Sequence, residues 1–311
     1  MPKIIIYLTL LFVTSVFAQD KKFTTEEVSV NSLLYGTLYK PENLTKKTNL
    51  VIIIAGSGIP DRNGNMPNMT TNAYKFLAES LVKNGNAVYA FDKRSIAQIK
   101  AGNVKEEDGS FEDLINDVKD IITYFKAKKQ YGKIILAGHS EGSLVGMVAA
   151  KGNADAFISL AGMGRSFDET LVEQIGKQAP FLKEETQKNF ELLKKGETFE
   201  LKTPALSAIF RKSVQPYLIS ILKYNPVAEI KKLEIPVLII NGTKDLQIPE
   251  SDAKLLHEAN PKSELVIIQN MNHIFKEIKG DSTENMESYN NPELPIMPEL
   301  SQKINSFLTK L

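Results

Sequence analysis

Short apolar runs alternate with amphipathic stretches along most of the chain. The runs with the length of a strand are residues 50–55, 87–92, 133–137, 154–160, 235–240 and 263–269. Between the first three of them, residues 74–83 and 111–126 carry apolar side chains at helical spacing. Strands that are apolar on both sides are typical of parallel sheets covered by helices. The alternation therefore predicts an α/β fold with a mostly parallel central sheet and helices on both faces.

Three segments depart from this alternation. Residues 27–30 and 33–39 predict two edge strands joined through Asn31-Ser32. Residues 161–234 are predicted to be helical throughout, and residues 275–298 form a long loop. Ligand sites of open parallel sheets lie beyond the carboxyl ends of the strands, so an insertion after such a strand overhangs the site. We therefore expect residues 161–234 to form a helical cap rather than extra surface packing, and the loop to be able to close over the site.

Composition narrows the class of protein. The 311 residues are 42% hydrophobic and 24% charged, without repeats, which indicates one globular domain with an insertion. With 38 basic and 37 acidic residues, the net charge of +1 favours neither nucleic acid nor an anionic membrane as a partner. Cysteine is absent, which excludes disulfides, thiol catalysis and thiolate metal sites.

The first 18 residues are typical of a signal peptide. Lys3 supplies a positive charge, residues 4–17 are apolar, and Val16-Phe17-Ala18 has the pattern of a cleavage site. The apolar run is shorter than the roughly 18–20 residues that span a bilayer. The sequence predicts a signal peptide at 1–18, a core at 19–160 and 235–311, and a cap at 161–234. The mature protein is expected to be periplasmic or secreted, with no stable membrane span.

The segment Gly138-His139-Ser140-Glu141-Gly142 carries the clearest chemical signal. It follows one apolar run and precedes a predicted helix, which is the context of a nucleophile elbow. In such an elbow the serine lies in a strained turn, and the residues two before and two after it must be small. Gly138 and Gly142 meet that requirement, so Ser140 is predicted to be a catalytic nucleophile.

A serine nucleophile needs a base to take its proton and a third group to orient the base. Of the three histidines, only His273 directly follows an apolar run, in a loop at the carboxyl end of a predicted strand. His139 should point away from the serine beside it and His257 lies within a helix, so both are interpreted as ordinary polar residues. His273 is the predicted base.

The orienting carboxylate is expected at the end of another strand. Asp245 lies five residues past the 235–240 run, in a loop that contains glycine. Glu250 and Asp252 are weaker candidates, because they are expected to begin the next helix as favourable first-turn charges. The predicted triad is therefore Ser140, Asp245 and His273.

The oxyanion of a tetrahedral intermediate needs preorganised N–H donors. One is expected from Glu141, the residue after the nucleophile. The other is expected from Ser57, in the glycine-rich loop 56–64 that follows the 50–55 run. That loop lacks the lysine of a phosphate-binding P-loop. Ser57 and Glu141 are thus the predicted oxyanion hole.

Four pieces of the chain resemble the α/β-hydrolases, and among them exported bacterial serine esterases with a helical cap, a group near serine aminopeptidase-like and dienelactone-hydrolase-like sequences. They are Gly36-Thr-Leu-x-x-Pro41, Gly56-Ser-Gly-Ile-Pro-Asp-Arg-Asn-Gly-Asn65, the elbow, and the Asp245 and His273 loops. The resemblance spans about residues 27–311 and implies the α/β-hydrolase fold with its order of serine, acid and histidine.

The resemblance leaves several supporting residues open. Gly56, Asp61 and Arg62 are candidates for contacting substrate or supporting the site. Asp92-Lys-Arg-Ser-Ile-Ala97 stands where the group has Asp-Lys-Arg-Gly-x-Gly, so this loop is expected to bend differently. Asp92 and Arg94 are interpreted as structural residues that hold the loop near the oxyanion site.

These features predict a carboxylic ester hydrolase that acts on a small-molecule ester through an acyl-enzyme, with no cofactor and no metal. The alternatives on the same triad are an aminopeptidase-type peptidase and an acyltransferase, and a non-catalytic binding protein is the alternative from another class. A peptidase would need a cap carboxylate for the substrate's α-ammonium group. The available candidates are Glu173, Glu184, Glu185, Glu191 and Glu197.

Overall fold

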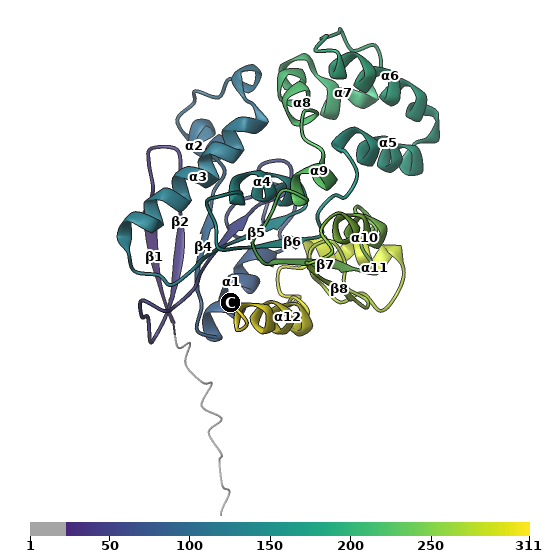
Figure 1. Cartoon of the computed structure of the whole chain (residues 1–311). Helices are drawn as coiled ribbons and strands as arrows, with labels where there is room; N and C mark the ends of the chain where they lie inside the picture. Colours follow the sequence, from purple (N-terminus) through teal and green to yellow (C-terminus); the bar gives the residue numbers. More distant parts are fainter. Residues whose placement is uncertain (1–22) are drawn as a thin grey trace, which may run out of the picture.

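Eight strands form one sheet in the order β1-β2-β4-β3-β5-β6-β7-β8 (Figure 1). The computed structural model describes residues 23–311, and the predicted signal peptide lies outside the described residues. The strands are β1 (Phe23–Ser29), β2 (Tyr35–Pro41), β3 (Leu50–Ile54), β4 (Ala87–Phe91), β5 (Ile134–His139), β6 (Ala156–Leu160), β7 (Val237–Gly242) and β8 (Glu264–Ile268). Six of the eight were predicted as apolar runs, and the first two as an N-terminal pair.

The sheet is parallel from β4 through β8, and β2 pairs antiparallel with both β1 and β4. The prediction of two edge strands is therefore wrong for β2, which lies between β1 and β4, so that of these two strands only β1 is at an edge. Its burial explains the difference, since Leu38 and Tyr39 are both buried. The fold-class prediction, a mostly parallel α/β sheet, is confirmed.

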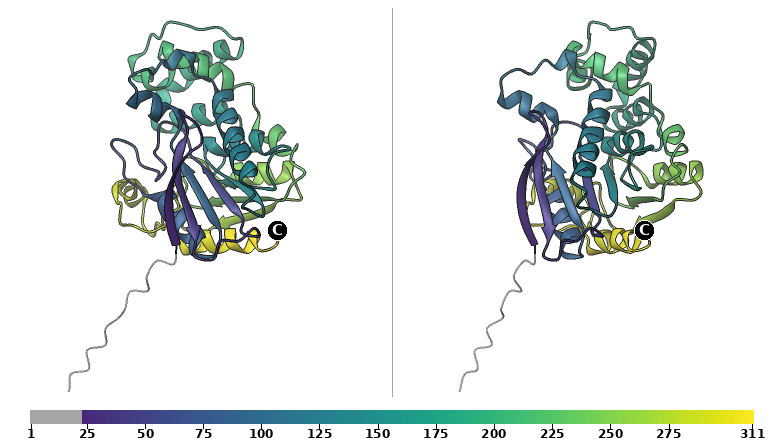
Figure 2. Two further views of the ribbon diagram at one scale, coloured as in Figure 1. Left: turned by 90° about the vertical axis from the view of Figure 1, so that its left-hand side faces the viewer. Right: turned by 60° about the vertical axis from the view of Figure 1, so that its left-hand side comes forward.

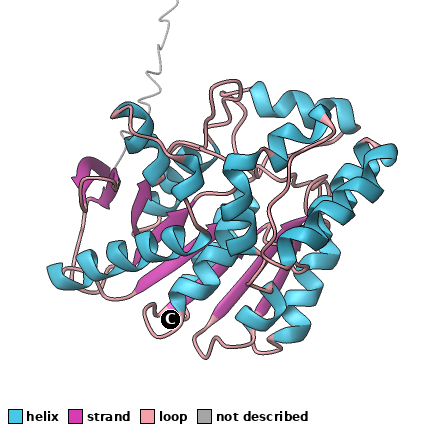
Figure 3. Ribbon diagram, turned by 90° about the horizontal axis from the view of Figure 1, so that it is seen from above, coloured by secondary structure: helices cyan, strands magenta, loops and turns pink. Residues whose placement is uncertain are grey.

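Helices cover both faces of the sheet because successive strand side chains point to opposite sides. On β3, Ile52 belongs to the same buried cluster as residues of α3 (Phe111–Lys128), α4 (Glu141–Ala150) and α10 (Glu250–Ala259). Ile53 belongs to the cluster on the other face, with residues of α1 (Ala73–Lys83) and α12 (Pro298–Leu308). Figure 3 shows helices lying across the strands in a view from above. Helix α3 begins with a capping box, in which the Ser110 side chain accepts the N–H of Asp113 and the Asp113 carboxylate accepts the N–H of Ser110.

Residues 161–234 connect β6 to β7 through five helices. These are α5 (Phe167–Gln178), α6 (Lys183–Lys194), α7 (Ser207–Phe210), α8 (Gln215–Ile221) and α9 (Pro226–Ile230). Helices α5 to α8 gather at the end of the molecule opposite α12 (Figures 1 and 2). The prediction that this segment is helical throughout is wrong for residues 197–203, which form no helix. Its polar and charged sequence, Glu197 to Thr203, lacks an apolar stripe at helical spacing and is followed by Pro204.

Two further helices interrupt predicted loops. Helix α2 (Arg94–Lys100) replaces the loop expected after β4, and α11 (Ser282–Glu287) lies within the long loop after β8. Short 3-10 turns cover Glu106–Asp108, Pro180–Leu182, Pro204–Leu206, Lys212–Val214 and Ser288–Asn290. None of the helices in residues 23–311 combines the length and the apolar character needed to cross a bilayer.

Candidate active site

Ser140 lies at the sharp turn between β5 and α4. Its backbone has φ 54 and ψ −122, a left-handed conformation that is strained for a residue with a side chain. A Cβ atom at Gly138 would lie 2.3 Å from the carbonyl oxygen of Gly142, and one at Gly142 would lie 2.5 Å from that of Ala55. Only glycine fits at either position, so the strand and helix approach each other as closely as the sequence predicts.

The side chains of His273 and Asp245 are joined by a hydrogen bond. The imidazole Nδ1 lies 2.8 Å from Oδ2 of Asp245, and both side chains are buried. The other carboxylate oxygen, Oδ1, accepts the backbone N–H groups of Gln247 and Ile248 at 2.8 and 2.9 Å. These bonds fix the carboxylate, which in turn fixes the imidazole plane.

Ser140 and His273 line one cavity, at the carboxyl ends of the parallel strands. Asp245 contacts the far nitrogen of the His273 ring and does not itself line that cavity. The other residues weighed for these roles lie elsewhere. His257 bonds Ser263, while Glu250 and Asp252 lie in the first turn of α10 as predicted.

The loop after β3 provides the opposite wall of the site. Gly56, Ser57 and Gly58 line the cavity together with Ser140 and Glu141. Within residues 23–311 no hydrogen bond engages the backbone N–H of Ser57 or of Glu141. Glu141 begins α4, and the first N–H groups of a helix have no partner within it. Two backbone donors are thus available beside Ser140.

Asp61 and Arg62 support this loop and do not line the cavity. Oδ1 of Asp61 accepts the N–H groups of Asn63 and Asn65 at 2.8 and 2.9 Å. Arg62 donates to Asp92 from its backbone N–H, Nε and Nη2, and also pairs with Glu27. Burial lowers the pKa of Arg62, but these hydrogen bonds outweigh it and raise the pKa above its ordinary value.

Asp92 and Arg94 both form structural contacts, as predicted, but only Asp92 bonds the loop beside the oxyanion site. Arg94 lies in α2 and pairs with Asp113 and Asp117 of α3. The residue between them, Lys93, reaches the site: its Nζ donates to the carbonyl of Gly58 at 3.2 Å and to Glu141 at 3.1 Å. Sequence reasoning missed Lys93 because its partners lie 35 and 48 residues away in the chain.

His139, interpreted from the sequence as an ordinary polar residue, also has specific partners at the site. It lines the cavity, its Nδ1 lies 2.8 Å from the Tyr74 hydroxyl, and its Nε2 lies 2.9 Å from the carbonyl oxygen of His273. Burial and the neighbouring His273 hold the pKa of His139 well below its ordinary value, so it is neutral. Nothing in the local pattern around His139 signals these two partners.

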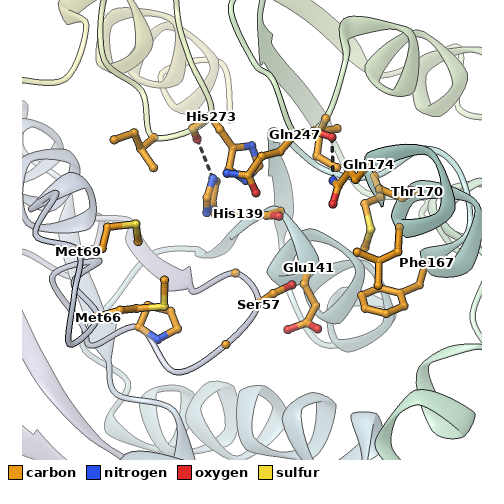
Figure 4. A pocket seen from close by; sticks show the side chains of 18 of the residues that line it. Ser57, Met66, Met69, His139, Glu141, Phe167, Thr170, Gln174, Gln247 and His273 are labelled. Carbon is orange, nitrogen blue, oxygen red and sulfur yellow. Dashed lines mark hydrogen bonds between the residues drawn. The ribbon is translucent and has the colours of Figure 1, made fainter. Parts of the chain in front are cut away.

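The cavity has a volume of about 430 Å³. Figure 4 shows Met66 and Met69 on one side of the central group of Ser57, His139 and Glu141, and Phe167 and Thr170 on the other. Most of its walls are apolar, including Pro60, Met66, Met69, Met163, Phe167, Leu171, Ile209, Val214, Leu218, Ile248 and Ile274. Gln174 of α5 donates from Nε2 to the carbonyl of Gln247 at 2.9 Å, which joins the inserted segment to the loop after β7.

The charged groups of the cavity wall already have partners. Among the described residues that line it, Glu141 is the one carboxylate, and it is held by Lys93 and Tyr217. Arg211 pairs with Glu106. Residues 23–311 hold no group of three or more His, Asp or Glu side chains arranged for a metal ion.

The sheet order, the strained serine turn and the histidine–aspartate pair define an α/β-hydrolase, as the sequence predicts. The family model BD-FAE matches residues 37–259, and the chain belongs to the BD-FAE family. Esterase EstD of Thermotoga maritima is 25% identical over 282 residues, which cover 86% of this chain and 64% of that relative. The chain thus spans less than two thirds of the length of this curated relative.

Solved structures confirm the fold. The alignment with Est1E from Butyrivibrio proteoclasticus has a TM-score of 0.58 and 18% sequence identity, and it covers 92% of this chain and 98% of Est1E. The Pyrococcus furiosus esterase Pf2001 has a TM-score of 0.55 at 17% identity, covering 93% and 91%. A dienelactone hydrolase from Anabaena variabilis has a TM-score of 0.52 at 16% identity, covering 93% and 98%.

Proposed function

We propose that this protein is a serine carboxylic ester hydrolase. The observation that carries the proposal is the 2.8 Å bond between His273 and Asp245 at a cavity that also exposes the strained Ser140 turn. The family membership and the names of EstD, Est1E and Pf2001 support an esterase.

The mechanism follows from the roles of the groups. His273 removes the proton of Ser140 as Oγ attacks the ester carbonyl, and Asp245 orients and stabilises the resulting imidazolium. The N–H groups of Ser57 and Glu141 bind the oxyanion, each contributing about 3 kcal/mol to lowering the barrier. His273 then protonates the leaving alcohol and activates the water that hydrolyses the acyl-enzyme.

The cavity favours an uncharged, largely apolar substrate. Burying a charge without a partner is costly, and both charged groups of the wall are already paired. None of the cap glutamates considered for a peptidase, Glu173, Glu184, Glu185, Glu191 and Glu197, lines the cavity. An ester therefore fits this site better than a peptide with a free α-ammonium group.

The direct test compares Ser140→Ala with the wild type on a panel of nitrophenyl esters. Ser140→Ala should lose all turnover and all labelling by a fluorophosphonate probe. Ser143→Ala is the matched control, since Ser143 lies three residues further on and bonds the Ser159 hydroxyl at 2.8 Å in the interior. Turnover by Ser140→Ala equal to that of the control would refute the proposal. Faster hydrolysis of aminoacyl anilides than of esters would favour the peptidase.

We further propose that the protein is exported and that residues 161–234 act as a cap that restricts access to Ser140. The signal-like residues 1–18 support the export, and the cavity-lining residues of α5 and α8 support the cap. N-terminal sequencing of the mature protein should begin at Gln19. A chain that still begins at Met1 in the cytoplasm would contradict the proposed export.

A further inference from the structure

A chain of buried hydrogen bonds runs beneath the candidate site. The backbone N–H of Gly56 donates to the Tyr74 hydroxyl at 3.1 Å, and that hydroxyl lies 2.8 Å from Nδ1 of His139. Nε2 of His139 lies 2.9 Å from the carbonyl oxygen of His273 (Figure 4). Tyr74, His139 and His273 are all buried.

The donors and acceptors of this chain can be assigned without ambiguity. The His273 carbonyl can only accept, so Nε2 of His139 carries a proton. Nδ1 of the neutral ring is then an acceptor, and the Tyr74 hydroxyl donates to it while accepting from Gly56. Every polar group in this hydrogen-bond chain has a partner, so replacing one of the side chains leaves a neighbouring group without its hydrogen bond.

The hydrogen-bond chain links the ends of two neighbouring strands, β3 and β5, to the loop after β8, which the sheet does not join to them directly. Gly56 follows β3, His139 ends β5 and His273 follows β8, and β6 and β7 lie between β5 and β8. Three members adjoin or belong to the proposed mechanism: Gly56 precedes Ser57, His139 precedes Ser140, and His273 is the proposed base. The His273 loop also contains two non-glycine residues with positive φ, Asn270 at 64 and Phe275 at 69. Such a strained loop persists only where its surroundings hold it.

Resting on the proposed function, we propose that Tyr74 and His139 are positioning residues. They hold the His273 backbone and the Gly56–Ser57 amides at fixed places around Ser140. Catalysis depends on such placement, and a displacement of about 1 Å can cost about 100-fold in rate. A change in these residues should therefore lower kcat and leave KM nearly unchanged, because both side chains are buried and their polar atoms bond protein groups.

The first test is Tyr74→Phe, which keeps the ring and its edge contact with His139 but removes the hydroxyl. Its kcat should fall about 10- to 100-fold, with KM within about twofold of the wild type. The matched control is Tyr89→Phe. Tyr89 is also fully buried, and its hydroxyl donates one bond to the carbonyl of Val28 at 3.1 Å, among core residues that do not line the cavity.

The second test examines rescue at His139. A glutamine side chain can present an N–H to the His273 carbonyl, whereas leucine cannot. His139→Gln should therefore retain at least 10 times the kcat of His139→Leu. Thermal unfolding of all variants separates loss of fold from loss of positioning.

The outcomes separate this inference from the proposed function. Absence of Ser140-dependent hydrolysis in the wild type would refute the proposed function. If the wild type is active, equal kcat in Tyr74→Phe and Tyr89→Phe overturns the positioning role. A rise in KM at constant kcat, or equal kcat in the two His139 variants, also overturns it.

Discussion

The hydroxyl of Tyr217 lies 2.7 Å from the carboxylate of Glu141 and donates a hydrogen bond to it. Glu141 follows Ser140 directly, and Tyr217 belongs to α8 of the inserted segment. The other carboxylate oxygen of Glu141 accepts from Lys93, which also bonds the carbonyl of Gly58. One buried carboxylate therefore joins the inserted segment, the chain after β4 and the proposed oxyanion loop.

Tyr217→Phe should destabilise the fold by about 1–3 kcal/mol, because it leaves a buried carboxylate oxygen without its donor. Urea unfolding measures this loss. Tyr224→Phe is the matched control, since its hydroxyl bonds the partly exposed Glu112 at 3.3 Å. The control should change stability by less than about 0.5 kcal/mol. Equal losses of unfolding free energy in the two variants would show that the Tyr217–Glu141 hydrogen bond does not stabilise the fold.

Asp245→Asn should reduce kcat by about 1,000- to 10,000-fold while the protein stays folded. The asparagine oxygen can still accept the N–H groups of Gln247 and Ile248, which preserves the loop. Its NH₂ group, however, would face Nδ1 of His273 and force the proton onto the other ring nitrogen, where it blocks proton removal from Ser140. Steady-state kinetics with an activated ester measure the effect. A loss of less than 10-fold would argue against Asp245 as the orienting carboxylate.

The buried His139 should make stability fall as the solution becomes acidic. Burial depresses its folded-state pKa well below the ordinary value of 6.5. Below that pH the unfolded chain takes up a proton that the folded protein does not, so this histidine lowers the free energy of unfolding by about 1.4 kcal/mol per pH unit. Its contribution is lost as pH falls from about 6.5 toward the folded-state pKa.

Unfolding of the wild type and of His139→Gln at pH 7.5 and 5.5 measures this contribution. The wild type should lose more stability between the two pH values than the variant, because glutamine does not titrate. NMR of the folded wild type should show His139 neutral at pH 5.5. Protonation of its ring above pH 6 would contradict the expectation.

Asp252 anchors the start of the inserted segment. It is fully buried in the first turn of α10, where its carboxylate accepts the N–H groups of Gly164 and Arg165 and pairs with the Arg165 guanidinium at 2.8 Å. Asp252→Ala should cost about 3 kcal/mol of stability, because it leaves the amides of Gly164 and Arg165 unpaired and leaves the Arg165 guanidinium with Glu173 as its remaining carboxylate partner. Glu250→Ala, in the same turn but paired only with Lys254 on the surface, should cost less than about 0.5 kcal/mol. Equal midpoints of urea unfolding for the two variants would refute this anchoring role.

Sequence reasoning succeeded where local pattern and position along the chain carry the information. The apolar runs located six strands, and Asp245 and His273 were chosen because each follows such a run. The elbow could be recognised because Gly138 and Gly142 meet a steric requirement that acts within five residues.

It failed where a residue's role depends on partners far along the chain. Tyr74 and His139 are 65 residues apart, and Tyr217 and Glu141 are 76 apart. No periodicity encodes such pairings. Helix α2 was missed because the resembling group has a loop at this point. This chain has Ser95 and Ala97 where that group has glycine, and both residues favour a helix more than glycine does.

Both ends of the inserted segment are attached to neighbouring strands. The N–H of Ala161 donates to the carbonyl of Ile240, and the N–H of Phe157 donates to that of Pro236. The chain therefore leaves the sheet at the carboxyl end of β6 and re-enters it at the amino end of the neighbouring parallel strand, β7. Residues 161–234 can accordingly diverge in length and composition without shifting the register of any strand. This arrangement makes the segment a module that evolution, or an engineer, can exchange while the strands that position Ser140, Asp245 and His273 are inherited unchanged.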